Sequence, residues 1–140
     1  MTQDESPSRT ACCKRRRGVA AIEFAVCLPI IVLLVLSTIE ACSMIFLKQT
    51  LAVAAYEGAR TAIIPGVTGD EVKEVCNEIL KDRKVSGGIV TISPKGFDDL
   101  KPGQFVDVTV SAPCNANSIV RNKFYKGRTL TSTASMMIEF

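Results

Sequence analysis

Apolar residues gather first in one long, unbroken run. From Val19 to Ile39 the chain is almost wholly apolar, and its only ionisable side chains are Glu23 and Cys27. About 20 apolar residues, each adding 1.5 Å of rise, span the ~30 Å hydrocarbon core of a bilayer. The run therefore predicts a membrane helix over residues 19–39. Pro29 lies inside it, where a bilayer tolerates a kink that would break a soluble helix.

The helical pattern continues beyond this run. Between residues 40 and 63, apolar residues recur three and four positions apart, which is typical of one helix face. Many of them are alanine, so another helix or a packed domain can approach closely. This face consists of Ala41, Met44, Ile45, Leu47, Leu51, Ala52, Ala55, Ala59 and Ala62. We therefore predict an extramembrane continuation of the helix over residues 40–64, ended by Pro65-Gly66.

Residues 65–140 predict a small exported domain. Thr68 followed by Glu71 has the form of a capping box, which predicts a second helix over about residues 69–84. Short alternating runs then predict strands at 89–92 and 105–110, and a weaker one at 129–139, with Pro/Gly turns between the first two. The fold class is therefore α+β: a long N-terminal transmembrane helix that continues outside the membrane, a second short helix and a three-stranded antiparallel sheet.

Charge is distributed unevenly along the chain. The net charge of +3 belongs to residues 1–17, whose last four residues are Lys14, Arg15, Arg16 and Arg17; acids and bases balance in the remainder. Short basic flanks stay on the cytoplasmic side of a membrane, which predicts a cytoplasmic leader over residues 1–18. A nucleic-acid-binding domain would carry its basic excess in the folded part, so we expect no nucleic-acid partner.

Composition argues against an enzyme. The chain has no histidine, which removes the commonest general base and metal ligand. Its six cysteines include no CxxC pair, so zinc-ribbon spacing is absent as well. We expect no catalytic residues, no metal, no cofactor and no small-molecule substrate.

The junction between leader and apolar run has three competing interpretations. A cleavable signal peptide would have a shorter apolar region and an early small-x-small site, whereas Ala52-Val53-Ala54 comes far too late. An uncleaved anchor could let Glu23 reach the membrane interface. A lipoprotein signal is not one of the three, because Glu40 stands where a lipid-attachment site needs a small residue.

The third interpretation is a prepilin-type signal, with a basic leader ending in Gly18 and a carboxylate five residues beyond it. Gly18 gives an open, flexible peptide, and cleavage after it would create a cationic amine on Val19. In a low dielectric an unpaired Glu23 carboxylate is costly, so pairing with that amine on a neighbouring helix is favoured. Glu23 would thereby set the axial register of a helical assembly.

Two patches then resemble a known family. The segment Arg16-Arg17-Gly18-Val19-Ala20-Ala21-Ile22-Glu23-Phe24-Ala25, continuing to Leu28-Pro29, looks like the start of TadE-like pseudopilins of tight-adherence (Flp-type) pilus systems. The segment 54–62 is similar to the family's alanine-rich EGAR segment. Together the two patches cover about residues 14–63. Val19 departs from type II secretion pseudopilins, which usually have Phe directly after the cut.

The resemblance implies a minor pilin-like subunit, cleaved between Gly18 and Val19 by a membrane prepilin peptidase. Its expected partners are that peptidase, other pilin-like subunits, pilus assembly proteins and the bacterial inner membrane. Helix packing is expected to involve residues of both patches. These are Phe24 and Pro29 in the first patch, and Glu57, Gly58, Ala59 and Arg60 in the second. The alternative is an uncleaved, single-pass, membrane-anchored binding module.

Two further features remain open from the sequence. Cys76 and Cys114 fall in the expected exported domain, where they form a disulfide or stay as buried free thiols. The segment Glu57 to Arg60 is either a solvated helix face with an ion pair or a docking point at its small residues. The pair Asp98-Asp99 is interpreted as a turn.

Overall fold

The computed structural model describes residues 12–94, 102–119, 125 and 127–139, with side chains from residue 18 onward. It divides into two compact units, Met1–Thr38 and Ile39–Phe140. Helix α1, Cys12–Ala62, contributes to both units. The expected turn at Asp98-Asp99 and the leader up to residue 11 lie outside the described residues.

Helix α1 begins earlier than the hydrophobic pattern predicts. The sequence predicts a cytoplasmic leader over residues 1–18 and a helix from Val19, but the helix starts at Cys12. The predicted start of the helix was therefore too late in the chain. Lysine and arginine are good helix formers, so the basic segment joins the helix although it has no apolar periodicity to reveal it.

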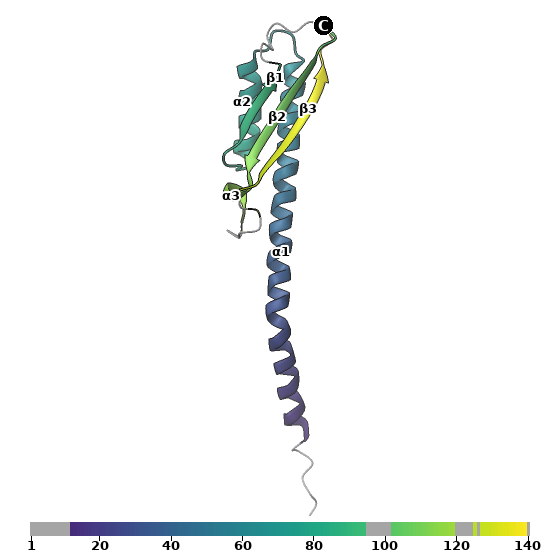
Figure 1. Ribbon diagram of the computed structural model, residues 1–140, viewed down its shortest axis with the longest axis vertical. Helices are drawn as coiled ribbons and strands as arrows, with labels where there is room; N and C mark the ends of the chain where they lie inside the picture. The colour runs from purple at the N-terminus through teal and green to yellow at the C-terminus, as the bar shows by residue number, and fades with distance from the viewer. Residues whose placement is uncertain (1–11, 95–101, 120–124, 126, 140) are drawn as a thin grey trace, which may run out of the picture. The chain divides into compact units, whose positions relative to one another are not determined.

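The second unit combines the later part of α1 with α2 (Gly69–Asp82) and a three-stranded sheet (Figure 1). The strands are β1 (Ile89–Ser93), β2 (Phe105–Pro113) and β3 (Thr129–Met137), in the order β1-β2-β3 and antiparallel throughout. The α+β fold class is confirmed. A single helical turn, α3 (Cys114–Asn117), was not predicted, because four residues are too few to show a period.

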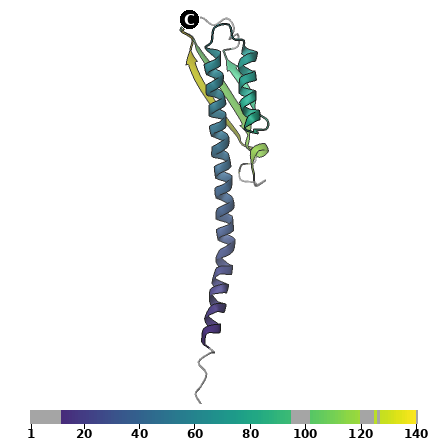
Figure 2. The same ribbon diagram turned by 180° about the vertical axis from the view of Figure 1, so that it is seen from behind.

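The core of this unit lies between the two helices and one face of the sheet. Seen from behind, α1 and α2 both lie in front of the strands (Figure 2). Alternate residues of β2, at 106, 108, 110 and 112, are fully or almost fully buried. They pack with a small-residue face of α1 and an apolar face of α2, formed by Leu47, Leu51, Ala54, Ala55, Ala59, Ala62, Val72, Cys76 and Leu80. The opposite face of the sheet carries polar pairs such as Thr109 and Thr133, whose hydroxyls lie 2.9 Å apart.

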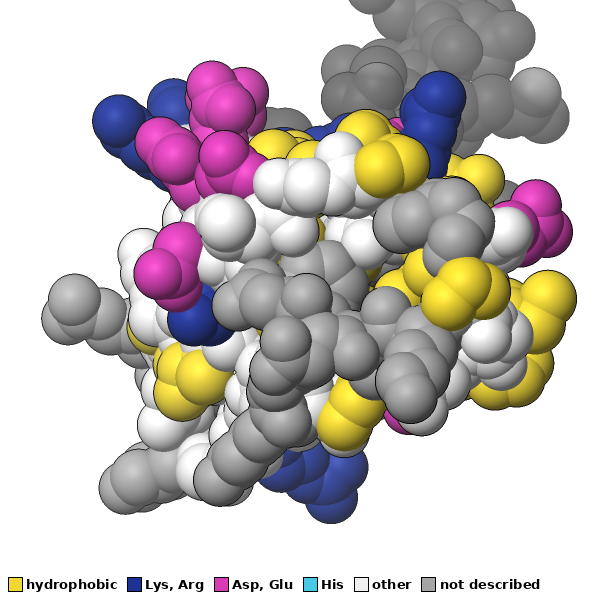
Figure 3. Space-filling model, turned by 90° about the horizontal axis from the view of Figure 1, so that it is seen from above, with side chains coloured by type: hydrophobic (Ala, Val, Ile, Leu, Met, Phe, Trp, Pro, Cys, Tyr) yellow, Lys and Arg dark blue, Asp and Glu magenta, His cyan; other side chains and the backbone are white. Residues whose placement is uncertain are grey.

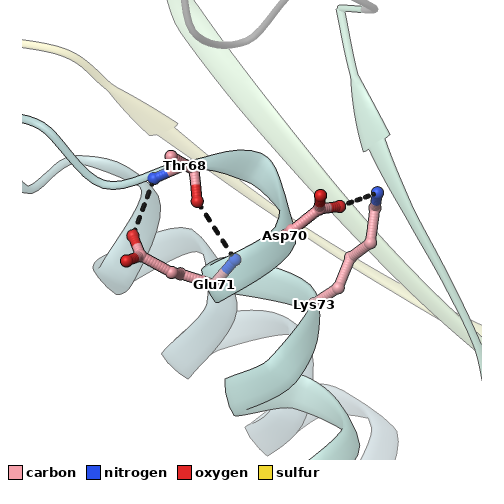
Figure 4. Close-up of polar contacts among 4 residues, drawn as sticks. All are labelled: Thr68, Asp70, Glu71 and Lys73. Atoms are coloured by element: carbon pink, nitrogen blue, oxygen red, sulfur yellow. Dashed lines mark hydrogen bonds and ion pairs between the residues drawn. The ribbon is translucent and has the colours of Figure 1, made fainter.

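Hydrogen bonds fix the start of α2 and the segment that follows the helix. The backbone N–H of Thr68 donates to the Glu71 carboxylate at 2.9 Å, and the Glu71 N–H donates to the Thr68 hydroxyl at 3.4 Å (Figure 4). The predicted capping box is therefore present. Beyond the helix, the Asn117 amide pairs with both the N–H and the carbonyl of Ser86, at 2.8 and 2.9 Å. Asn117 thus holds α3 against the segment that leads into β1.

Candidate functional site

The junction around Gly18 lies within the helical first unit. A Cβ built on Gly18 meets nothing within 4 Å, so the backbone there is open on the helix surface. Val19 is 55% exposed, and Glu23 is also exposed. Among the described residues, no hydrogen bond or ion pair holds the Glu23 carboxylate. Gly18 lies inside α1, so the peptide after it is helical, while the residues around it and the Glu23 side chain are exposed to another molecule.

The apolar segment that follows is exposed along its whole length. Every described residue from 18 to 38 is exposed, including Phe24 and Pro29. The hydroxyls of Ser37 and Thr38 donate to carbonyls one turn earlier, at 2.8 Å each, so these polar groups are satisfied within the helix. The helix is long and apolar enough to cross a membrane, and none of its most apolar stretch is buried against protein. A bilayer supplies the apolar surroundings that the chain itself does not.

The Glu57–Arg60 segment lies in the second unit and shows both features that the sequence left open. The Arg60 guanidinium is 3.7 Å from the Glu57 carboxylate on the outer side of α1. On the inner side, Ala59 is fully buried. A Cβ on Gly58 would lie 2.4 Å from the Cys76 sulfur and 3.1 Å from a Val108 methyl. Gly58 therefore marks a point where α1, α2 and β2 approach one another closely, and the docking partner there is the chain's own domain.

The two candidate disulfide partners are free thiols in the structure. Both are fully buried. The Cys76 sulfur is directed at α1, where it donates to the Ala54 carbonyl at 3.4 Å, and burial raises the pKa of this thiol to about 11. Of the two states considered for Cys76 and Cys114, the structure shows the unbonded one. Their thiols serve as small apolar fillers of the core.

Sequence reasoning missed two polar anchors between α1 and the rest of the second unit. Glu40 is 2% exposed, and its carboxylate accepts a hydrogen bond from the Ser118 hydroxyl at 2.5 Å. The Lys48 ammonium donates to the main-chain carbonyl of Thr131 on β3. Neither partner is close in sequence, so no local spacing could have indicated these contacts.

The described residues contain no group of three or more acidic or cysteine side chains that could hold a metal ion. Acidic side chains gather at one corner of the face seen from above, beside lysine or arginine side chains (Figure 3). On α2, the charged groups of Asp70 and Lys73 lie 2.8 Å apart at the surface (Figure 4). That ammonium lowers the pKa of Asp70, as expected for an exposed carboxylate beside a cation.

These features define a class: a protein whose described residues include one apolar helix able to cross a membrane and a small α+β unit to which the later part of that helix contributes. Residues 18–60 match the sequence model of the TadE-like protein family. The matched segment is thus TadE-like, and over residues 18–60 the resemblance inferred from the motifs is confirmed. The match begins at Gly18 and ends at Arg60, so it contains the Gly18–Glu23 motif and the EGAR residues. No curated protein and no solved structure matches the chain.

Proposed function

We propose that this protein is a minor pilin-like subunit that is cleaved between Gly18 and Val19 and then assembles through its N-terminal helix into a Tad/Flp-type pilus or a related secretion apparatus. The family and the single apolar span support a membrane-anchored, pilus-associated protein. The observation that carries the finer proposal is the order of residues at the start of the matched segment. An exposed glycine follows four cations, and one carboxylate, Glu23, stands alone in an exposed apolar helix.

The proposed step is electrostatic and non-enzymatic. A prepilin peptidase removes residues 1–18 and leaves a protonated amine on Val19. In the membrane, the Glu23 carboxylate of one subunit pairs with that amine on its neighbour, because an isolated charge in a low dielectric is costly. The pair aligns adjacent helices along their axes. The basic flank supports a cytoplasmic N-terminus, and an α+β domain on the outer side of the inner membrane is proposed with it.

N-terminal sequencing and intact mass of the chain from its native membranes test this proposal. We expect the mature protein to begin at Val19, and a Gly18→Ala chain to accumulate uncleaved. A Glu23→Gln chain should be cleaved normally but should fail to enter the assembled fraction. Glu40→Gln is the matched control, because it removes a carboxylate of the same helix that is held inside the second unit. A native chain that still begins at Met1 would support the alternative, an uncleaved membrane-anchored binding module.

A further inference from the structure

The extramembrane part of α1 carries an apolar stripe that the domain does not cover. Cys42, Ile45, Gln49, Ala52 and Tyr56 are all exposed, and they are three and four positions apart. We call these five residues the α1 seam. The residues that α1 buries against the sheet and α2 lie on another side of the helix. The seam is therefore a second face of the helix, exposed but mainly apolar, whereas an exposed helix face is ordinarily polar.

The spacing of the seam is that of a coiled coil. Positions that alternate by three and four residues form the contact line between two supercoiled helices. None of the five seam residues carries a formal charge. The charged residues of this part of α1 are engaged elsewhere: Glu40 with Ser118, Lys48 with Thr131, and Glu57 with Arg60. The seam can thus face an identical seam without like-charge repulsion.

We propose that the α1 seam pairs with the same seam of a second copy of this chain, as a short parallel coiled coil. Two copies anchored by the same helix have the same orientation in the membrane, so their helices are parallel. Gln49 then meets Gln49, and an amide is self-complementary because it has both donors and an acceptor. A single polar residue in such a line fixes the register of the pair.

Surface area indicates why the partner must share the membrane. Phe46 flanks the seam and is 57% exposed, and Tyr56 is 53% exposed. An aromatic side chain buries roughly 150–250 Å², so covering both rings removes roughly 200 Å² from each copy. Stable complexes in solution bury at least about 1,200 Å² in total. The seam alone is too small for that, but confinement in one bilayer raises the effective concentration of the partner. A second copy meets this condition and presents the same seam.

This pairing requires only the membrane anchor and does not depend on cleavage at Gly18. It is tested by cysteine cross-linking of the full-length chain in native membranes, with Cys12, Cys13 and Cys27 replaced by alanine. Cys42 is then the exposed thiol of the described residues, since Cys76 and Cys114 are buried. An added copper–phenanthroline oxidant converts neighbouring thiols to disulfides. Co-expression of two differently tagged copies identifies a second copy in the cross-linked product.

The scan moves the single exposed cysteine along the helix. In a Cys42→Ala background, we expect Ile45→Cys, Gln49→Cys, Ala52→Cys and Tyr56→Cys to form mixed-tag dimers. Their yield should be roughly fivefold or more above that of Ser43→Cys and Glu57→Cys, which lie off the contact line. Two further variants keep Cys42 as the exposed thiol. Gln49→Lys should abolish the dimers formed through Cys42, because it sets two ammonium groups against each other, whereas Gln49→Asn should retain these dimers. Protection of Cys76 from a maleimide in each variant verifies that the domain is folded.

The same scan is repeated in the uncleaved Gly18→Ala chain, where we expect the same pattern. Equal cross-linking at seam and control positions would overturn the proposal and indicate that lipid covers the seam. A product with the mass of another protein in place of the mixed-tag dimer would also overturn it. Dimers in the cleaved chain but not in the uncleaved Gly18→Ala chain would also contradict the proposal, because the pairing would then require cleavage as well as the membrane anchor.

Discussion

Replacing Gly58 with alanine tests the close approach of α1 to the domain. The added Cβ would lie 2.4 Å from the Cys76 sulfur, 3.1 Å from a Val108 methyl and 3.7 Å from a Val72 methyl. A separation of 2.4 Å between heavy atoms cannot persist, so α1, α2 or the cysteine must shift. The sulfur has little freedom, because the thiol is fully buried and is hydrogen-bonded to the Ala54 carbonyl.

Two terms of opposite sign decide the magnitude. Overpacking of a well-packed core costs about 1–3 kcal/mol. Alanine in place of glycine inside a helix stabilises it by about 1 kcal/mol. Since the nearest atom belongs to a short, constrained side chain, we expect the packing cost to lie toward the upper end of its range. The net result is a free energy of unfolding reduced by about 1–2 kcal/mol, a factor of roughly 5–30 in the open population.

Alkylation of Cys114 in the full-length, detergent-solubilised chain measures this change. Cys114 is fully buried, so it reacts only when the domain opens. With Cys12, Cys13, Cys27 and Cys42 replaced by alanine, we expect Gly58→Ala to increase the labelling rate by roughly the factor above. Adding Cys76→Ala removes the clashing sulfur and should return most of the lost stability, a coupling that a double-mutant cycle isolates. A wild-type labelling rate in Gly58→Ala, or no recovery in the double variant, would refute the packing argument.

Two further outcomes are expected from the same unit. Thr68→Ala removes one half of the capping box and should lower the free energy of unfolding by about 1 kcal/mol, whereas Thr68→Ser should retain most of this stabilisation. Chemical denaturation followed by circular dichroism compares the two variants. Equal midpoints would contradict the role of the cap. Burial raises the pKa of Cys76 from 9.0 to about 11, so the folded state holds the thiol proton more tightly than the unfolded state does. The contribution of this thiol to the free energy of unfolding should therefore be fully present below about pH 9 and be lost as the pH rises toward about 11. The thermal midpoint of Cys76→Ala should lack this decline. An unchanged slope in that variant would show that Cys76 is not the source of the decline.

Local signals carried the fold prediction. The capping box at Thr68 and the alternation along residues 106–110 depend on neighbours within a few positions, and both are visible in the sequence alone. The family resemblance likewise rests on two short contiguous patches, one beginning at Arg16 and one at Ala54. Such features are encoded where they act, so a single sequence is sufficient to find them.

Contacts between distant residues were not predictable in this way. The Glu40–Ser118 hydrogen bond joins residues 78 positions apart, and neither residue lies in a motif. The alanine-rich face of α1 was expected to accept a helix or a domain, but the sequence could not choose between them. The structure assigns most of that face to the domain, while Ile45 and Ala52, placed on the same stripe, are exposed. One broad stripe in the sequence is thus two surfaces in the protein.

The contact between Lys48 and Thr131 bears on how the sheet behaves among neighbours. Strand β3 is an outer strand, and its nine residues include no charge and no proline. Uncovered strands of this kind tend to recruit further strands and to start aggregation. Because the Lys48 ammonium donates to the Thr131 carbonyl, an incoming strand would have to displace a cation before it could bond there. In the proposed assembly, this contact would hinder the pairing of β3 with a strand of a neighbouring subunit.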